Sequence, residues 1–90
     1  MSQIRTAVIG VGHQGRWHAD KFKVLERSNL VAVVDANEEH VEAVARDLDV
    51  LALTDFRELV GKVDAVSIAT PTPSHFEIVG HLLEHGIHVL

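Results

Sequence analysis

The chain has 90 residues, 47% of them hydrophobic and 23% charged, which is the composition of one globular domain rather than a disordered segment. Its formal net charge is −5, with 13 acidic and 8 basic residues and no basic cluster, which argues against a nucleic-acid partner. Cysteine is absent, which excludes disulfides, and the sequence predicts neither a signal peptide nor a membrane span, so we expect a cytoplasmic protein without a membrane partner.

Strands and helices are predicted to alternate from the first residues onward. Residues 4–10 form a nearly continuous apolar run, which is typical of strands in parallel sheets covered on both faces. Residues 13–25 predict a helix, in which we expect Trp17 and Phe22 to be core or interface aromatics. Residues 30–34 predict the second strand.

A second helix is predicted after Asn37, a residue type that favours the N-cap position. Residues 50–53 predict a short third strand at an edge of the sheet. Asp55, with Glu58 three residues later, then predicts a brief helix through residue 59 or 60. The apolar stripe of the second helix, spaced for core packing, is Val41, Val44, Ala45 and Leu48.

The last predicted helix follows a strand over residues 65–69 and a Thr-Pro-Thr-Pro segment at residues 70–73. The prolines keep this segment extended and prevent an early helix start. Ser74 and Glu77 form a capping box, so the helix is expected to begin at this box and to end at Gly86. Its side chains expected to be buried are Ile78, Val79, Leu82 and Leu83.

The motif G-x-G-x-x-G lies between the first strand and the first helix, over residues 10–15. Glycine is needed there for a tight turn, for close approach of backbone to phosphate, and for close packing of helix on strand. Asp35, 20 positions beyond the last glycine, ends the second strand, where a carboxylate can accept hydrogen bonds from ribose hydroxyls. The cofactor-binding residues expected from this pattern are Gly10, Gly12, His13, Gln14, Gly15 and Asp35.

The cofactor is predicted to be NAD rather than NADP. Ala36 and Asn37 offer no positive charge for a 2′-phosphate, and the Asp35 carboxylate would repel one. Two alternatives remain open: the glycine loop as a ligand-free turn, and Asp35 as an ordinary strand-end carboxylate or helix cap.

A fifth strand begins in residues 87–90, and the alternation as a whole predicts a Rossmann-type doubly wound parallel sheet in three α/β/α layers. In the strand order 3-2-1-4-5 the chain reverses direction between the first and fourth strands. The ligand crevice is then expected between residues 10–15 and 70–75.

The sequence resembles the glucose–fructose oxidoreductase, inositol dehydrogenase and MocA family of nicotinamide-dependent sugar dehydrogenases over essentially its whole length. The segments that carry the resemblance are residues 7–19, 33–35, 64–75 and 81–90, of which Ala69-Thr70-Pro71-Thr72-Pro73-Ser74-His75 is the most specific. The resemblance implies that Thr70, Pro71, Thr72 and His75 line the cofactor near the nicotinamide ribose. For His75, a role as a polar residue in the first turn of a helix is the alternative.

Family members continue into a Glu-Lys-Pro segment and a second domain with the substrate contacts, which lie beyond Leu90. The resemblance therefore implies that residues 1–90 are the partial, N-terminal dinucleotide-binding domain of a larger dehydrogenase acting on a sugar, polyol or related alcohol. We expect this chain to bind NAD(H) without turnover, since no residue is an evident catalytic acid or base. The sugar or polyol substrate is expected only in the full-length protein.

Two further expectations concern other roles. A non-catalytic nucleotide-sensing or oligomerising module is the alternative function, and a homo-oligomer is possible through the last strand as an unpaired edge. His81 and His85 are four residues apart and could share a metal, but no third ligand at suitable spacing is evident, so an exposed polar face and no metal site are expected.

Overall fold

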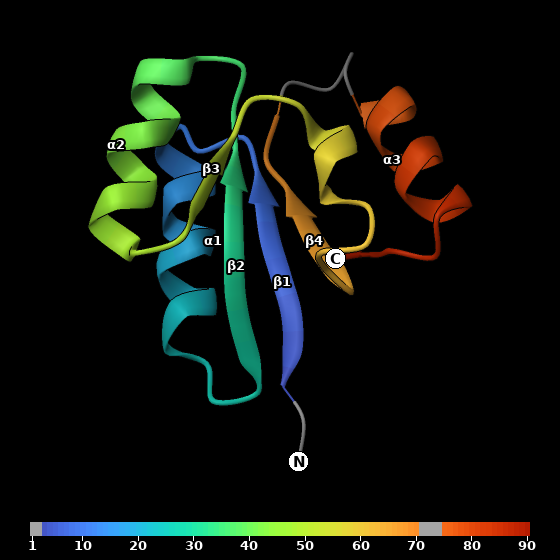
Figure 1. Ribbon diagram of the computed structural model, residues 1–90, viewed down its shortest axis with the longest axis horizontal. Helices are drawn as coiled ribbons and strands as arrows, with labels where there is room; N and C mark the ends of the chain where they lie inside the picture. Colours follow the sequence, from blue (N-terminus) through green and yellow to red (C-terminus); the bar gives the residue numbers. More distant parts are fainter. Residues whose placement is uncertain (1–2, 71–74) are drawn as a thin grey trace.

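A computed structural model describes residues 3–70 and 75–90 of the chain. Strands and helices alternate as predicted (Figure 1). Their bounds are β1 (Ile4–Ile9), α1 (His13–Val24), β2 (Ser28–Val34), α2 (Glu38–Leu48), β3 (Leu51–Leu53), the 3₁₀ helix η1 (Phe56–Leu59), β4 (Ala65–Ile68), α3 (His75–Glu84) and β5 (His88–Val89). The strands pair in parallel in the order β3-β2-β1-β4-β5, which confirms the predicted Rossmann-type doubly wound sheet with β3 at an edge.

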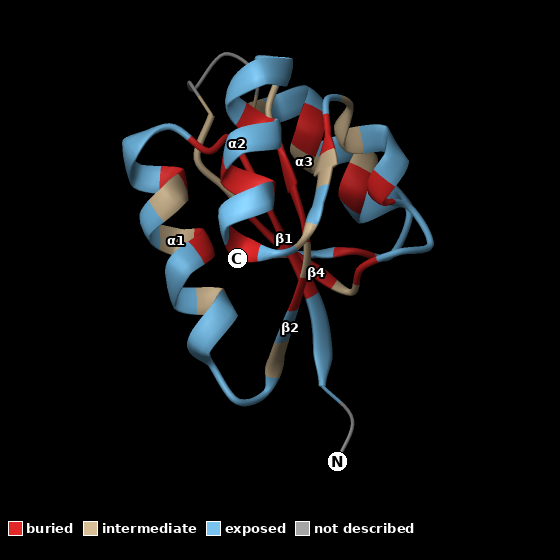
Figure 2. Cartoon of the chain, turned by 60° about the vertical axis from the view of Figure 1, so that its left-hand side comes forward, coloured by how far each residue is buried: buried red, intermediate tan, exposed pale blue. Residues whose placement is uncertain are grey.

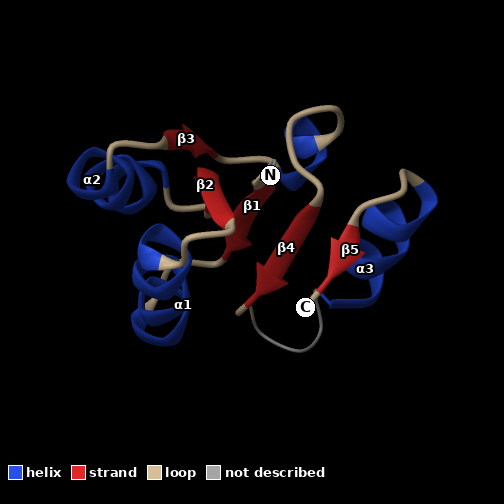
Figure 3. Ribbon diagram, turned by 90° about the horizontal axis from the view of Figure 1, so that it is seen from below, coloured by secondary structure: helices blue, strands red, loops and turns tan. Residues whose placement is uncertain are grey.

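Helices cover both faces of the sheet, so the predicted three layers are confirmed (Figures 1 and 3). Successive side chains of a strand point to opposite faces. In β1, Val8 therefore joins the core cluster that contains α1 and α2, while Ala7 and Ile9 join the cluster that contains η1 and α3. Buried residues gather in the strands and on the inward sides of the helices (Figure 2). This two-sided burial explains why the strands read as continuous apolar runs.

β2 begins two residues before its predicted start. Ser28 pairs with Ile4, and Asn29 pairs with Arg5, at the amino end of β1. Backbone pairing with a neighbour extends a strand regardless of side-chain polarity, so an apolar pattern cannot locate this end. At the other end of β1 the strand stops before Gly10, whose φ of 88° lies in the left-handed region.

α2 is the helix that its sequence predicts most fully. The Asn37 side chain accepts a hydrogen bond from the His40 backbone N–H at 3.0 Å, which confirms the predicted N-cap. The four residues of its apolar stripe, Val41, Val44, Ala45 and Leu48, are all buried. Asp49 ends the helix in a left-handed conformation with φ of 56°.

Of the two placements expected for Trp17 and Phe22, core or interface, the core is wrong for Trp17, which is 57% exposed, while Phe22 is partly buried against the core. The buried residues of α1 are Gly15 and Ala19 alone, because the helix packs closely on the sheet through small residues. Trp17 instead lies at the surface, with Lys21 Nζ 5.2 Å from its ring centroid.

On the opposite face, Asp55 caps η1 as predicted, by accepting from the Arg57 backbone N–H at 2.9 Å. In α3, Ile78 and Leu82 are buried, but Leu83 is 59% exposed, so its predicted burial is wrong. α3 covers the sheet with a narrow stripe, which leaves the residue after Leu82 facing outward. Ser74, the first residue of the predicted capping box, lies outside the described residues.

Candidate functional site

The carboxyl ends of three neighbouring strands meet at one edge of the sheet. The Gly10 backbone N–H donates to Val34 O at 2.6 Å, and the Asp35 N–H donates to Leu53 O at 3.1 Å. The Ala69 N–H donates to Ile9 O at 2.8 Å. These bonds continue the ladder beyond the strands, so the residues that follow β1, β2 and β4 are fixed side by side. This is the switch point at which open parallel sheets bind ligands.

Two glycines allow the backbone segments at this edge to approach each other closely. A Cβ at Gly10 would lie 2.9 Å from Thr70 Cγ2, and one at Gly15 would lie 1.6 Å from Gly10 O. Any other residue at position 15 would push α1 away from the end of β1. The structure thus assigns two of the predicted glycine functions, the tight turn at Gly10 and close helix-on-strand packing at Gly15.

The third glycine leaves the start of α1 open. Gly12 is the N-cap, it supplies no side-chain cap, and a Cβ there would have no neighbour within 4 Å. The first turn of α1 carries no acidic residue. The N–H groups of a helix's first turn lack intrahelical partners and carry about half a positive charge, so this end of α1 suits an anion such as a pyrophosphate.

Asp35 connects the glycine loop to the start of α2. Its Oδ2 accepts the Val11 backbone N–H, and its Oδ1 accepts the Asn37 backbone N–H, both at 3.0 Å. The carboxylate therefore organises the turn before α2. This is part of the alternative role expected for Asp35, that of a strand-end carboxylate or helix cap. A carboxylate has about four acceptor positions, so each oxygen retains room for a ribose hydroxyl.

A cavity of about 470 Å³ lies over this edge of the sheet. It brings together four of the predicted site residues, Gly10, Gly12, Asp35 and Thr70. Sequence reasoning did not identify the other polar or aromatic lining residues, which are Thr54, Phe56 and Glu77. A signal existed for Thr54, because it directly follows β3 and so lies at the same carboxyl edge. For Phe56 and Glu77 no local pattern pointed to the cavity.

The remaining predicted residues lie elsewhere. His13 lines a second hollow of about 390 Å³, together with Val11, Gly12, Arg16, Trp17 and His40. Gln14 is exposed, and Gly15 is buried beneath the loop rather than in the cavity wall. His75 Nε2 lies 2.7 Å from Thr70 O, so its ring contacts the backbone at the end of β4. Pro71 and Thr72 lie outside the described residues.

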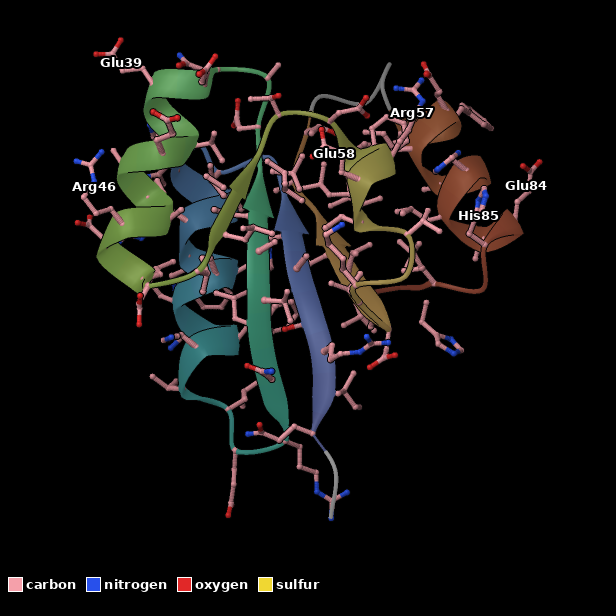
Figure 4. All side chains as sticks on the ribbon, in the orientation of Figure 1. Glu39, Arg46, Arg57, Glu58, Glu84 and His85 are labelled. Carbon is pink, nitrogen blue, oxygen red and sulfur yellow. The ribbon has the colours of Figure 1, made fainter. Side chains whose placement is uncertain are left out.

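One ion pair connects η1 to α3 beside the cavity. Arg57 Nη2 lies 2.6 Å from Glu77 Oε1, and Figure 4 shows Arg57 between the two elements. The Arg57 backbone N–H also holds the pKa of the Asp55 carboxyl below its ordinary value. The same guanidinium lies 3.2 Å from Asp55 Oδ1, so its positive charge is shared between Asp55 and Glu77, and Glu77 lines the same cavity as Asp35.

Within residues 3–70 and 75–90, no group of three or more His, Cys, Asp or Glu side chains is arranged to hold a metal ion. No helix in these same ranges combines the length and apolar character required to cross a bilayer. His81 and His85 do approach each other, with ring centroids 4.4 Å apart, and His85 Nδ1 lies 2.8 Å from the His81 carbonyl oxygen.

Comparison with known families decides the class of site. Residues 4–90 match the family described as an oxidoreductase family with an NAD-binding Rossmann fold. The chain belongs to the Gfo/Idh/MocA oxidoreductase family. The match includes the glycine loop, Asp35 and the segment after β4, so the cavity lies in an NAD-binding Rossmann domain.

Individual relatives agree in fold. UDP-N-acetylglucosamine 3-dehydrogenase from Acidithiobacillus ferrooxidans is 43% identical over 90 residues, and its solved structure superposes with a TM-score of 0.91 over 100% of this chain. Scyllo-inositol dehydrogenase from Lactobacillus casei, solved with bound NAD(H) and scyllo-inositol, is 25% identical over 98% of this chain, with a TM-score of 0.90. A 2,7-anhydro-N-acetylneuraminate hydratase from Mediterraneibacter gnavus is 34% identical over 99% of the chain.

This chain spans about a quarter of the length of these relatives. It covers 28% of the UDP-N-acetylglucosamine dehydrogenase, 27% of the scyllo-inositol dehydrogenase and 24% of the hydratase. The similarity therefore concerns the dinucleotide-binding domain of each relative, and the rest of each relative has no counterpart in residues 1–90.

Proposed function

We propose that this chain is the N-terminal NAD-binding portion of a nicotinamide-dependent oxidoreductase that acts on a sugar, polyol or related alcohol. The observation that carries this proposal is the single cavity shared by Gly10, Gly12, Asp35 and Thr70, which come from the ends of three different strands. A dinucleotide needs contacts at its phosphates and at both of its ends, and these strand ends supply them together.

Each part of the site has a proposed role. The uncapped first turn of α1 binds the pyrophosphate, Asp35 accepts hydrogen bonds from the adenosine ribose, and the segment from Thr70 to His75 contacts the nicotinamide end. Within this proposal, Thr70, Pro71, Thr72 and His75 keep the roles that the family resemblance implies.

NAD is proposed in preference to NADP on electrostatic grounds. The Asp35 carboxylate lines the cavity, and Ala36 beside it carries no charge. A further hollow, adjoining the first at Thr54, is lined by Glu38, Glu42 and Glu58. A 2′-phosphate at this position would meet several carboxylates, and no described lysine or arginine lines either hollow.

Catalysis is proposed to require more protein than these residues. A nicotinamide cofactor held at this site would supply a hydride acceptor, and the hydroxyl proton of the alcohol would need a base within hydrogen-bond range. Our proposal assigns the role of this base to no side chain that lines the described cavity. We therefore propose cofactor binding without turnover by residues 1–90, and substrate binding by the further length that the relatives possess.

The test is a titration of the chain with NADH and, separately, with NADPH. Binding is measured by calorimetry and by energy transfer from Trp17. We expect saturable NADH binding that is at least tenfold tighter than NADPH binding, about 1.4 kcal/mol. Asp35→Asn should weaken NADH binding and reduce the ratio of NADH affinity to NADPH affinity. The control Glu84→Gln on α3 should change neither quantity. Equal or tighter binding of NADPH would contradict the proposed preference.

The alternative, a non-catalytic nucleotide-sensing or oligomerising module, has one observation in its favour. Three apolar residues on α3 and directly after β5 are exposed, namely Phe76 (92%), Leu83 (59%) and Leu90 (69%). A homo-oligomer formed through this side is the corresponding proposal. Sedimentation that stays monomeric across concentrations would argue against it.

A further inference from the structure

Both backbone polar groups of Val11, inside the glycine loop, are bonded by side chains from the segment after β2. The Val11 N–H donates to Asp35 Oδ2 at 3.0 Å, and the Val11 carbonyl oxygen lies 2.6 Å from His40 Nε2. Val11 itself is fully buried. The loop is therefore held by two side chains that lie 24 and 29 residues further along the chain.

The holding segment is itself ordered by two hydrogen bonds. The Asn37 N–H donates to Asp35 Oδ1, and the Asn37 side chain accepts the His40 N–H, each at 3.0 Å. The chain from β2 into α2 thus fixes where His40 begins, at the first turn of a helix whose other side is packed in the core. His40 projects from a rigid base rather than from a loop.

The contact defines which ring nitrogen carries hydrogen. A carbonyl oxygen can only accept, so His40 Nε2 must be protonated and donate to Val11 O. The bond is short, and its acceptor belongs to a buried residue, where an unpaired carbonyl would be unfavourable.

The contact at the Val11 carbonyl also orients the N–H of Gly12, because both groups belong to the same planar peptide. In a planar trans peptide the carbonyl of one residue and the N–H of the next point in opposite directions. The peptides among the described residues contain no cis bond. His40 lies in the hollow shared with His13 and Arg16, whereas Asp35 and Thr70 lie in the larger cavity, and Gly12 borders both. Holding Val11 O toward His40 turns the Gly12 N–H away from His40.

We propose that His40 is a positioning residue for the glycine loop. By donating Nε2–H to the Val11 carbonyl, it keeps the Val11–Gly12 peptide in the orientation that directs the Gly12 N–H toward the cofactor phosphates. A flipped peptide would instead present a carbonyl oxygen to an anion. The link to phosphate rests on the proposed NAD-binding function, whereas the hold on the loop does not depend on it.

Three variants of the chain test the proposal by NADH titration. His40→Leu removes the donor and should weaken NADH binding about tenfold, because a misaligned N–H loses a hydrogen bond to a charged group. His40→Gln keeps a donor at a similar reach and should restore affinity to within about threefold of the unchanged chain. His85→Leu is the matched control, since it also removes a ring contact to a carbonyl, but on α3 (Figure 4), and should change nothing.

Nuclear magnetic resonance of the free chain separates this inference from the proposed function. We expect the ¹⁵N signals of His40 to report hydrogen on Nε2, and the ¹³C signal of the Val11 carbonyl to shift in His40→Leu but not in His85→Leu. If the unchanged chain binds no NADH, the proposed function fails, and these signals alone decide whether His40 holds the loop.

Two results would overturn the inference. One is a His40→Leu chain that melts and binds NADH like the unchanged chain. The other is a His40 ring with hydrogen only on Nδ1, or a Val11 carbonyl signal that does not respond to the loss of the imidazole.

Discussion

α1 and α2 lie on the same face of the sheet and have nearly equal lengths, 12 and 11 residues, but they are built in opposite ways. α2 has a side-chain N-cap from Asn37, acidic residues in its first turn and Arg46 in its last. α1 starts at Gly12 without a side-chain cap and without an acidic first turn. α2 buries four side chains, Val41, Val44, Ala45 and Leu48, whereas α1 buries only Gly15 and Ala19.

The difference separates a helix that stabilises the domain from a helix whose first turn we propose to bind the cofactor phosphates. A cap and a first-turn carboxylate would satisfy the N–H groups that an anion needs, so α1 lacks both. α1 is instead held by close packing at Gly15 and by the hydrogen bonds that Asp35 and His40 make to the loop before it. The same kind of substitution should therefore have opposite effects when it is made in α1 and in α2.

The largest effect is expected for Gly15→Ala. Its Cβ would lie 1.6 Å from Gly10 O, so α1 or the glycine loop must move, at a loss of about 3 kcal/mol of folding free energy. NADH binding should be lost together with stability. Chemical denaturation followed by circular dichroism measures the first effect, and calorimetry measures the second.

The matched control is Gly80→Ala in α3, where a Cβ would meet nothing within 4 Å. This change should stabilise the chain by about 0.5–1 kcal/mol, since alanine favours helix over glycine. A Gly15→Ala chain as stable as this control would show that the close approach of Gly15 to Gly10 has no energetic weight.

A smaller and opposite pair of effects is expected at the two N-caps. Asn37→Ala should lower stability by about 1 kcal/mol, because α2 loses its cap. Gly12→Ser should leave stability unchanged or slightly higher, since space for a side chain exists there, yet weaken NADH binding about tenfold as the hydroxyl takes up the N–H groups. Thermal melts and NADH titrations of both variants give the comparison. Tighter NADH binding by Gly12→Ser would reverse the interpretation of the open N-terminus.

The smallest effect is expected at the opposite end of the sheet, away from both N-caps. The Arg5 guanidinium and backbone N–H lower the pKa of the Asp64 carboxyl from 3.8 to about 2. Because the pKa is lower in the folded chain, the ionised carboxylate stabilises the fold above pH 3.8, and this contribution is lost as the pH falls toward 2.

Asp64→Asn should therefore lower Tm slightly at pH 7, and the difference from the unchanged chain should vanish near pH 2. Both groups are exposed, so the effect is small. NADH affinity at pH 7 should be unaffected, and the exposed Glu39→Gln on α2 (Figure 4) provides the charge control. A Tm difference that persists at pH 2 would exclude the ion pair as its cause.

Much of the fold could be predicted because its signals are local. Continuous apolar runs marked the strands, Asn37 and Asp55 marked helix starts, and the spacing of glycines marked the turn after β1. The exposure of Trp17, for which core and interface were both expected, and that of Leu83, for which burial was expected, have one cause. Helical spacing identifies apolar residues, but the width of the stripe that is buried depends on how closely the helix lies on the sheet.

The residues of the candidate site likewise fall into those that the sequence predicted and those that it did not. Gly10, Gly12 and Asp35 were predicted from motif and strand position, Thr70 was predicted from the family resemblance, and all four line one cavity. Phe56 and Glu77 entered the cavity wall from η1 and α3 without any sequence signal, since their place depends on the packing of elements remote in sequence.

The sequence by itself determined the alternation of strands and helices, the parallel sheet with its switch point, and the glycine and acidic residues that suit a dinucleotide. These follow from backbone preferences and side-chain periodicity over a few residues. Only the tertiary structure decided that Gly15 touches Gly10, that Asp35 and His40 bond the two backbone polar groups of Val11, and that Glu77 forms an ion pair with Arg57. Such contacts depend on the relative placement of whole elements, which the close packing of the core fixes.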